Sequence, residues 1–121
     1  MGFTDVFFCP LLVNHLANIF IHMFERHLSG LYHVVSSESL SKYDFGVRLA
    51  QRFNLDSGLI NPASVTQSGL QAVRSPNLTL HSDKLAKALG ESLPNISTGL
   101  EGLYTLYQQG YPHRIRSLAS W

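Results

Sequence analysis

The longest apolar stretch of the chain, residues 6–24, repeats its hydrophobic side chains at helical spacing. The recurring apolar positions are Leu12, Leu16, Ile19, Phe20, Met23 and Phe24. Polar residues interrupt the stretch at Asn14, His15, Asn18 and His22. A membrane span needs about 20 mostly apolar residues, so the pattern favours one amphipathic helix. We predict that this helix begins just after Pro10 and ends near Ser29 and Gly30, because glycine can adopt the left-handed backbone that closes a helix.

The pattern changes directly after Gly30. Residues 31–35 form a short run of β-branched and aromatic side chains, which predicts a buried strand. Leu59 and Ile60 predict a second, shorter strand. Since one or two strands cannot form an independent sheet, the predicted strands need partners.

A second helix is predicted to begin at Ser41. Ser41 and Asp44 have the spacing of a capping box, which satisfies the free backbone amides of a first helical turn. We expect this helix to end between Asn54 and Gly58. The positions predicted to face the core are Phe45, Val47, Leu49, Ala50 and Phe53. The positions predicted to face water are Lys42, Arg48 and Arg52.

Two more helices are predicted in the last third of the chain. Ser82 is expected to cap a short helix over residues 83–89, which Gly90 closes. Thr98 and the glutamate three residues later repeat the capping-box spacing for a last helix that ends at Gly110. The chain is therefore predicted to be mostly helical, with about four helices and one or two short strands.

The composition limits the possible classes of protein. A chain of 121 residues has room for a single domain, here residues 1–121. With 45% hydrophobic residues, it is neither a disordered nor a collagen-like segment. The formal charge is +1 and the basic residues are spread along the chain, so nucleic acid is not the expected partner. Only 14% of the residues are charged, against about 25% in ordinary domains, which suggests that a large apolar contact covers part of the surface.

Cysteine and histidine patterns predict neither disulfide nor metal chemistry. The single cysteine, Cys9, cannot form an internal disulfide, and its apolar neighbours predict a buried, inert thiol in a cytoplasmic protein. The six histidines form no zinc-binding motif. Gly99 and Gly102 are the closest approach to a phosphate-binding loop, but they lie inside a predicted helix and lack a third glycine.

One group of polar residues stands out in the long polar connection over residues 61–77, which is of a kind that is usually functional. Arg74 precedes Pro76, and a planar guanidinium on a stiff loop suits two-pronged capture of a phosphate. Asn77 and Thr79 can hydrogen-bond hydroxyl groups nearby. The alternative interpretation is an exposed arginine without a specific role. The residues alone leave both interpretations open.

Three segments resemble one family, in the same order along the chain. Residues 10–17 (Pro-Leu-Leu-Val-Asn-His-Leu-Ala) resemble its Pro-Thr-Tyr-Val-x-Asp-Leu-Ala element. Residues 30–34 (Gly-Leu-Tyr-His-Val), followed by residues 41–45, resemble its Gly-x-Tyr-His-Val strand and the next helix start. Residues 74–84 are similar to its Arg-Pro-x-Asn-Leu-Ser/Thr-Leu-Asp-x-x-Lys segment. The chain thus resembles the C-terminal, substrate-binding part of the extended short-chain dehydrogenase/reductases, in the dTDP-4-dehydrorhamnose reductase branch.

The resemblance implies an α/β family in which a separate N-terminal Rossmann domain holds NAD(P) and contributes a Tyr-x-x-x-Lys pair. None of the five tyrosines here has a lysine four residues later. The resemblance therefore implies no catalytic residue in this chain and no cofactor bound by it alone. The positions where the chain departs from the family pattern are Leu11, Leu12, His15, Ser75 and His81.

The same resemblance implies substrate-binding roles for four residues. Arg74 would pair with the diphosphate of a nucleotide-linked sugar, and Asn77 would fix the loop or a sugar hydroxyl. Pro10 and Leu12, within residues 8–12, would line the sugar pocket. The implied partners are the sugar nucleotide and the missing Rossmann domain or a partner subunit.

Two functional classes stay open at this stage. The first is the substrate-binding portion of an NAD(P)-dependent nucleotide-sugar reductase, which is not catalytic alone. The second is a non-catalytic binding or regulatory subunit, because the same fold branch resembles the regulatory β subunit of methionine adenosyltransferase. A small membrane protein built on residues 6–24 is disfavoured by the polar interruptions.

Overall fold

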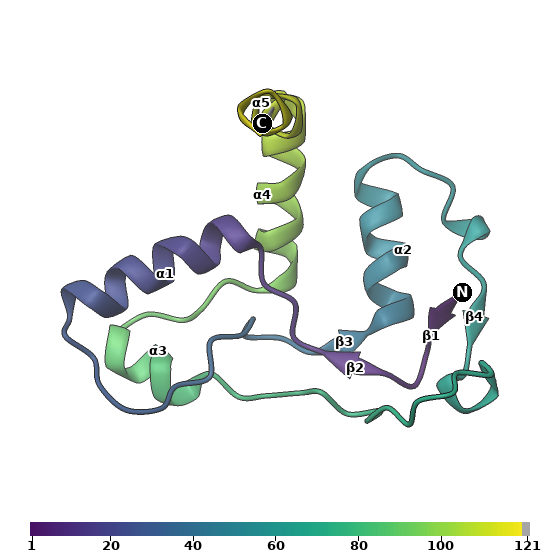
Figure 1. The fold of residues 1–121 in the computed structure, drawn as a ribbon, viewed down its shortest axis with the longest axis horizontal. Helices are drawn as coiled ribbons and strands as arrows, with labels where there is room; N and C mark the ends of the chain where they lie inside the picture. Colours follow the sequence, from purple (N-terminus) through teal and green to yellow (C-terminus); the bar gives the residue numbers. More distant parts are fainter. Residues whose placement is uncertain (120–121) are drawn as a thin grey trace.

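The computed structural model describes residues 1–119 as a mostly helical chain, as the sequence predicts. Its described residues contain two pairs of short strands, where one or two short strands are predicted. The strands are β1 (Gly2–Phe3), β2 (Phe7–Phe8), β3 (Leu40–Ser41) and β4 (Pro62–Ala63). The α-helices are α1 (Val13–Glu25), α2 (Lys42–Arg52), α3 (Asp83–Leu89), α4 (Ile96–Gln108) and α5 (Tyr111–Leu118). Two 3-10 turns, η1 (Ser57–Leu59) and η2 (Val65–Gln67), flank β4. Figure 1 shows the strands along an extended base, with α2 and α4 rising from it and α5 across the far end of α4.

The strands tie distant parts of the chain together. β1 pairs with β4 in parallel, with Gly2 opposite Pro62 and Phe3 opposite Ala63. β2 pairs with β3 in antiparallel orientation, which places Phe7 opposite Ser41 and Phe8 opposite Leu40. The backbone amide of Lys42 donates to the carbonyl of Val6 at 2.9 Å, so the start of α2 is held against the N-terminal segment.

The strand predicted over residues 31–35 is wrong, because these residues have no strand partner within the described chain. Two of their side chains, Tyr32 and Val34, instead pack against a core cluster. The strand predicted at Leu59 and Ile60 is also misplaced. Asp56 accepts a hydrogen bond from the amide of Gly58 at 2.9 Å, which favours the turn η1, and pairing starts only at β4.

Helix ends follow the predicted signals in part. Ser41 caps α2 as predicted, since its hydroxyl accepts from the amide of Asp44 at 3.0 Å and donates to the Asp44 carboxylate at 2.7 Å. Gly90 closes α3 in the left-handed conformation with φ of 74°. The helix α1 begins at Val13, two residues later than a start just after Pro10. It ends at Glu25, earlier than predicted, because His27 already adopts a positive φ of 51°.

The capping predictions for α3 and α4 are wrong in detail. Ser82 precedes α3 but makes no side-chain capping hydrogen bond. The cap of α4 is Asn95, whose carboxamide oxygen accepts from the amide of Thr98 at 2.8 Å, so the helix starts two residues before Thr98. The turn at Gly110, with φ of 70°, does not end the helical part of the chain, because the unpredicted helix α5 follows it.

Two small apolar clusters form the core. The first contains Ile19, Leu85, Leu89 and Leu93, and the second contains Leu40, Ile96 and Leu100. Phe45 and Leu49 pack against the second cluster from α2, as predicted. Arg52 departs from its prediction, because it pairs with Glu101 on α4 and only 34% of its side chain is exposed.

The surface is large for a chain of this mass. Its accessible area is 8532 Å², against about 6,500 Å² for a compact monomer of 13.5 kDa. A continuous apolar stripe on the outer face of α1 contributes to the excess, and we call it the α1 stripe: Ala17, Phe20, Ile21 and Phe24. Phe24 is 82% exposed. Within residues 1–119, no helix combines the length and the apolar character needed to cross a membrane.

Candidate functional site

A cavity of about 490 Å³ lies between the N-terminal segment, the first turn of α2 and the loop that follows η2. We call it the cationic cavity, because Lys42 and Arg74 are the charged side chains that line it among the described residues. Its remaining walls are Phe3, Val6, Val65, Leu70, Ser75 and Leu78. Apolar walls with a few placed polar groups, in a volume of this size, are typical of small-molecule sites.

The carboxylate of Asp5 holds one side of the cationic cavity in place. It accepts hydrogen bonds from the hydroxyl of Ser64 and, at 2.9 Å, from the backbone amide of Val65. These hydrogen bonds, the one from Ser64 foremost, lower the pKa of Asp5 below its usual range. The ionised carboxylate therefore fixes η2 against the turn between β1 and β2.

Backbone pairing fixes the loop that carries Arg74. The amide of Phe7 donates to the carbonyl of Pro76, and the amide of Leu78 donates to the carbonyl of Phe7, both at 2.9 Å. Asn77 lies between these two contacts, and its side-chain oxygen accepts from the amide of Thr79 at 3.1 Å. Asn77 therefore shapes the turn and is not part of the lining of the cationic cavity.

The electrostatics of the cationic cavity favour an anion. Within residues 1–119, no carboxylate forms an ion pair with Lys42 or Arg74. The ammonium of Lys42 lies 5.5 Å from the ring centre of Phe8, a cation–π contact. Two unpaired cations on opposite segments of the chain can hold the oxygens of a phosphate or diphosphate, and the guanidinium can bind two of them at once.

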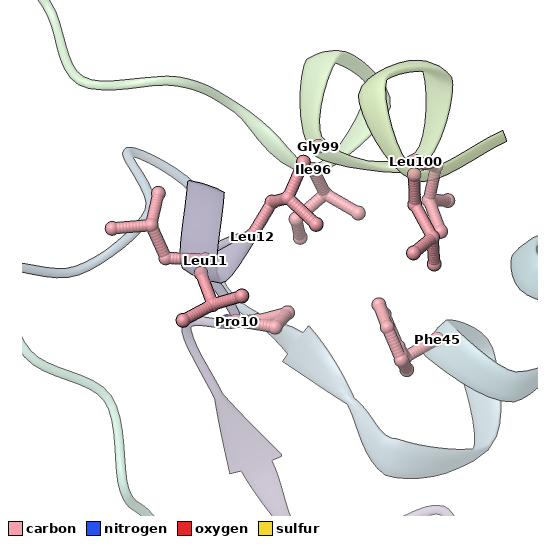
Figure 2. Close-up of a pocket in the computed structure, with 9 residues that line it drawn as sticks. Pro10, Leu11, Leu12, Phe45, Ile96, Gly99 and Leu100 are labelled. Carbon is pink, nitrogen blue, oxygen red and sulfur yellow. The ribbon is translucent and has the colours of Figure 1, made fainter. Parts of the chain in front are cut away.

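Pro10 and Leu12 line a second, smaller cavity of about 200 Å³, the apolar cavity (Figure 2). Figure 2 shows both residues with Phe45 of α2 and with Ile96, Gly99 and Leu100 of α4. Phe8 packs edge-on against Phe45, with ring centres 5.5 Å apart. Among residues 1–119, no charged side chain lines the apolar cavity, so its walls offer apolar contacts only. The four residues predicted for substrate binding are thus divided: Arg74 lines one cavity, Pro10 and Leu12 line the other, and Asn77 lines neither.

Sequence reasoning missed Lys42 as a site residue. Helical periodicity places it on the water-facing side of α2, but it is the first residue of that helix and follows β3 directly. The pairing of β3 with β2 carries it next to the loop of Arg74. The capping residue Ser41 predicts that Lys42 begins the helix. The spatial neighbours of Lys42 depend on a strand pairing that short sequence patterns do not encode.

The part of the chain that the structure describes offers little support for a metal site, a glycine-rich phosphate site or a reactive thiol. No three His, Cys, Asp or Glu side chains within residues 1–119 gather as metal ligands. Gly99 and Gly102 lie inside α4, as predicted, and not at a helix N-terminus that could hold a phosphate. Cys9 is half-buried rather than fully buried, and its thiol lies 3.5 Å from the carbonyl of Leu80.

Residues 3–109 match the family described as the RmlD substrate binding domain. The chain belongs to this family, which confirms the resemblance that its three segments predict. The match ends before α5 begins.

Among solved structures, the chain is similar to dTDP-4-dehydrorhamnose reductase from Bacillus anthracis str. Ames, whose crystal structure is a complex with NADP. The TM-score is 0.72 and the sequence identity is 23%, so the likeness establishes the fold. The match covers 86% of this chain but only 37% of that enzyme. The chain therefore spans little more than a third of the enzyme's length. No curated protein sequence matches the chain significantly.

Proposed function

We propose that this chain is the substrate-binding portion of an NAD(P)-dependent nucleotide-sugar reductase similar to dTDP-4-dehydrorhamnose reductase, and that it is not catalytic alone. Membership of the RmlD substrate binding domain family supports the substrate class. The observation that carries the proposal is the cationic cavity, where Lys42 and Arg74 face one space with apolar walls. In this role the two cations bind the diphosphate, and the apolar side chains contact the base or the sugar ring.

The remainder of the reductase, in this proposal, is a Rossmann domain that covers the α1 stripe. Phe20, Ile21 and Phe24 are 52%, 55% and 82% exposed, which is costly for side chains of this size in water. The chain exposes about 2,000 Å² more than a compact monomer of its mass. A contact of that size is typical of a permanent interface. A cytoplasmic location, which the single cysteine predicts, belongs to the same proposal.

In this proposal the nicotinamide cofactor is held by residues outside this chain. Gly102 lies within α4, and a Cβ atom added there would approach Leu12 to 3.0 Å and His15 to 3.2 Å, so this glycine serves helix packing rather than a phosphate cradle. None of the five tyrosines has the lysine spacing used by the family for hydride transfer. The role left to this chain is to bind and orient the sugar nucleotide.

Titration of the 121-residue chain with dTDP by isothermal titration calorimetry tests the proposal. We expect dTDP to bind, and we expect Arg74→Ala and Lys42→Ala each to weaken binding about tenfold, the effect of losing one charge-assisted hydrogen bond. Arg48→Ala is the matched control, because Arg48 is another exposed cation of the chain and does not line the cationic cavity. Circular dichroism of each variant establishes that its helix content is unchanged.

Three results would overturn the proposal. The first is dTDP binding that neither Arg74→Ala nor Lys42→Ala weakens. The second is oxidation of NADPH by the chain alone when dTDP-4-dehydrorhamnose is added, since the proposal leaves hydride transfer to residues outside this chain. The third is failure of dTDP to bind the folded chain, which would favour the alternative of a binding or regulatory subunit.

A further inference from the structure

A third cavity, which we call the α5 groove, lies where α5 meets the ends of α2 and α4 and the start of α1. Its volume is about 660 Å³, within the range of about 300–1,000 Å³ of ligand sites. Phe53, which directly follows α2, lines the groove together with Leu106 and Tyr107 of α4. Tyr111 and Ile115 contribute from α5. Almost all of the lining is apolar, and within residues 1–119 Arg116 is the single charged residue that lines it.

Side-chain contacts hold together the elements that form the walls of the α5 groove. The side-chain amide of Asn14 on α1 donates to the hydroxyl of Tyr111 on α5 at 3.2 Å, which ties the two helices together. Phe53 packs edge-on against Tyr104 and Tyr107, with ring centres 5.3 and 5.4 Å apart. Three aromatic rings therefore anchor the ends of α2 and α4 beside the groove.

The α5 groove shares no lining residue with the cationic cavity, although it shares Leu12, Val13 and Leu103 with the apolar cavity. The match to the RmlD substrate binding domain ends at residue 109, and α5 spans Tyr111–Leu118. The wall that α5 contributes therefore lies beyond the matched residues, while the rest of the lining lies within them.

Charge identifies the kind of ligand that fits. Helix α5 carries His113, Arg114 and Arg116 and contains no acidic residue. The guanidinium of Arg114 lies over the ring of Tyr111, 5.4 Å from its centre. Arg116 has no ion pair within residues 1–119 and lies in the last turn of α5. The groove therefore combines a mostly apolar lining with one cation that has no ion pair within residues 1–119.

We propose that the α5 groove binds an anionic single-chain amphiphile, a free fatty acid, with its alkyl chain along the apolar lining and its carboxylate at Arg116. Binding is favoured because it removes the apolar surface of both the alkyl chain and the groove from water. The carboxylate keeps contact with solvent and pairs with the guanidinium. This proposal does not depend on the proposed reductase role.

Equilibrium dialysis of the 121-residue chain with dodecanoate, below its micelle concentration, tests the proposal. We expect dodecanoate to bind more tightly than dodecyltrimethylammonium, which has the same tail and the opposite charge. Arg116→Glu should weaken dodecanoate binding about tenfold and remove this preference. Arg114→Glu changes the net charge equally on the same helix but outside the groove lining, so it should leave the preference in place.

A second variant tests the apolar part of the groove. Ile115→Trp puts a larger side chain at the groove lining and should weaken binding of both amphiphiles. Equal effects of Arg114→Glu and Arg116→Glu, or unchanged binding in Ile115→Trp, would overturn the proposal. So would a wild-type dimer in analytical ultracentrifugation that Ile115→Trp dissociates, because a second copy would then fill the groove. Titration of Arg116→Glu with dTDP, which should match wild type, separates this test from that of the cationic cavity.

Discussion

Arg52 on α2 binds Glu101 on α4 through two hydrogen bonds, from Nε to Oε1 at 2.5 Å and from Nη2 to Oε2 at 2.9 Å. Its guanidinium carbon also lies 3.6 Å from the ring centre of Tyr104. The planar guanidinium is thus bound along its edge by the carboxylate of Glu101 and over its face by the ring of Tyr104. This contact joins two helices that both contribute to the lining of the apolar cavity and of the α5 groove.

The Arg52–Glu101 pair should make stability depend on pH. The hydrogen bonds from Arg52 lower the pKa of Glu101 below its usual range. A carboxylate with a lowered folded-state pKa stabilises the fold above its ordinary pKa, about 4.3, and loses this effect as the pH falls through the lowered value. We therefore expect Glu101→Gln to reduce the melting temperature at pH 7 and to change it little at pH 2, measured by circular dichroism.

Glu25→Gln is the control for this measurement, because Glu25 is an exposed carboxylate with no ion pair within residues 1–119. It should leave the melting temperature unchanged at both pH values. Equal losses in Glu101→Gln at both pH values would show that the pair does not stabilise the fold through its charge.

Two glycines of α4 should respond in opposite directions to the same substitution. Gly99→Ala should stabilise the chain by about 0.5–1 kcal/mol, because alanine favours helix and a Cβ atom there meets nothing within 4 Å. Gly102→Ala should destabilise it by about 1–3 kcal/mol, because the added atom would lie 3.0 Å from Leu12 and 3.2 Å from His15. Urea unfolding of both variants measures the two signs, and a stabilising Gly102→Ala would show that α1 and α4 pack more loosely than described.

The stability of the core should depend most on Leu85, a fully buried residue of α3 that clusters with Ile19 of α1. Leu85→Ala should lower the free energy of unfolding by about 2–5 kcal/mol, through lost apolar burial and the cavity left behind. Leu31→Ala removes the same atoms from a side chain that is 77% exposed, so its effect should be below about 0.5 kcal/mol. Comparable losses in both variants, measured by chemical unfolding, would contradict the assignment of the core.

The α1 stripe should govern association of the chain. Phe24→Asp places a charge at an 82% exposed apolar position, so it should reduce self-association without lowering the melting temperature. Val73→Asp, at a fully exposed apolar residue in the loop before Arg74, is the matched control and should change association less. Sedimentation velocity measures the difference, and equal effects of the two substitutions would show that α1 has no special role in association.

The sequence by itself determined the elements whose signals are local. Ser41 and Asp44 begin α2, and Gly90 ends α3, because a cap or a left-handed turn depends on side chains only a few residues apart. The three segments that carry the family resemblance were also readable, since they are short runs of residue types in a fixed order. Residues 31–35 show the limit, because their strand-forming side chains have no neighbouring strand within the described chain.

The tertiary structure alone decided which residues share a cavity. The β2–β3 pairing carries Lys42 to the loop of Arg74, although the two residues are far apart in sequence and helical periodicity turns Lys42 toward water. The same structure separates Arg74 from Pro10 and Leu12, and it adds α5 beyond Gly110 to form a groove. Such neighbours depend on backbone hydrogen bonds and packing between distant segments, which arise only when the whole chain has folded.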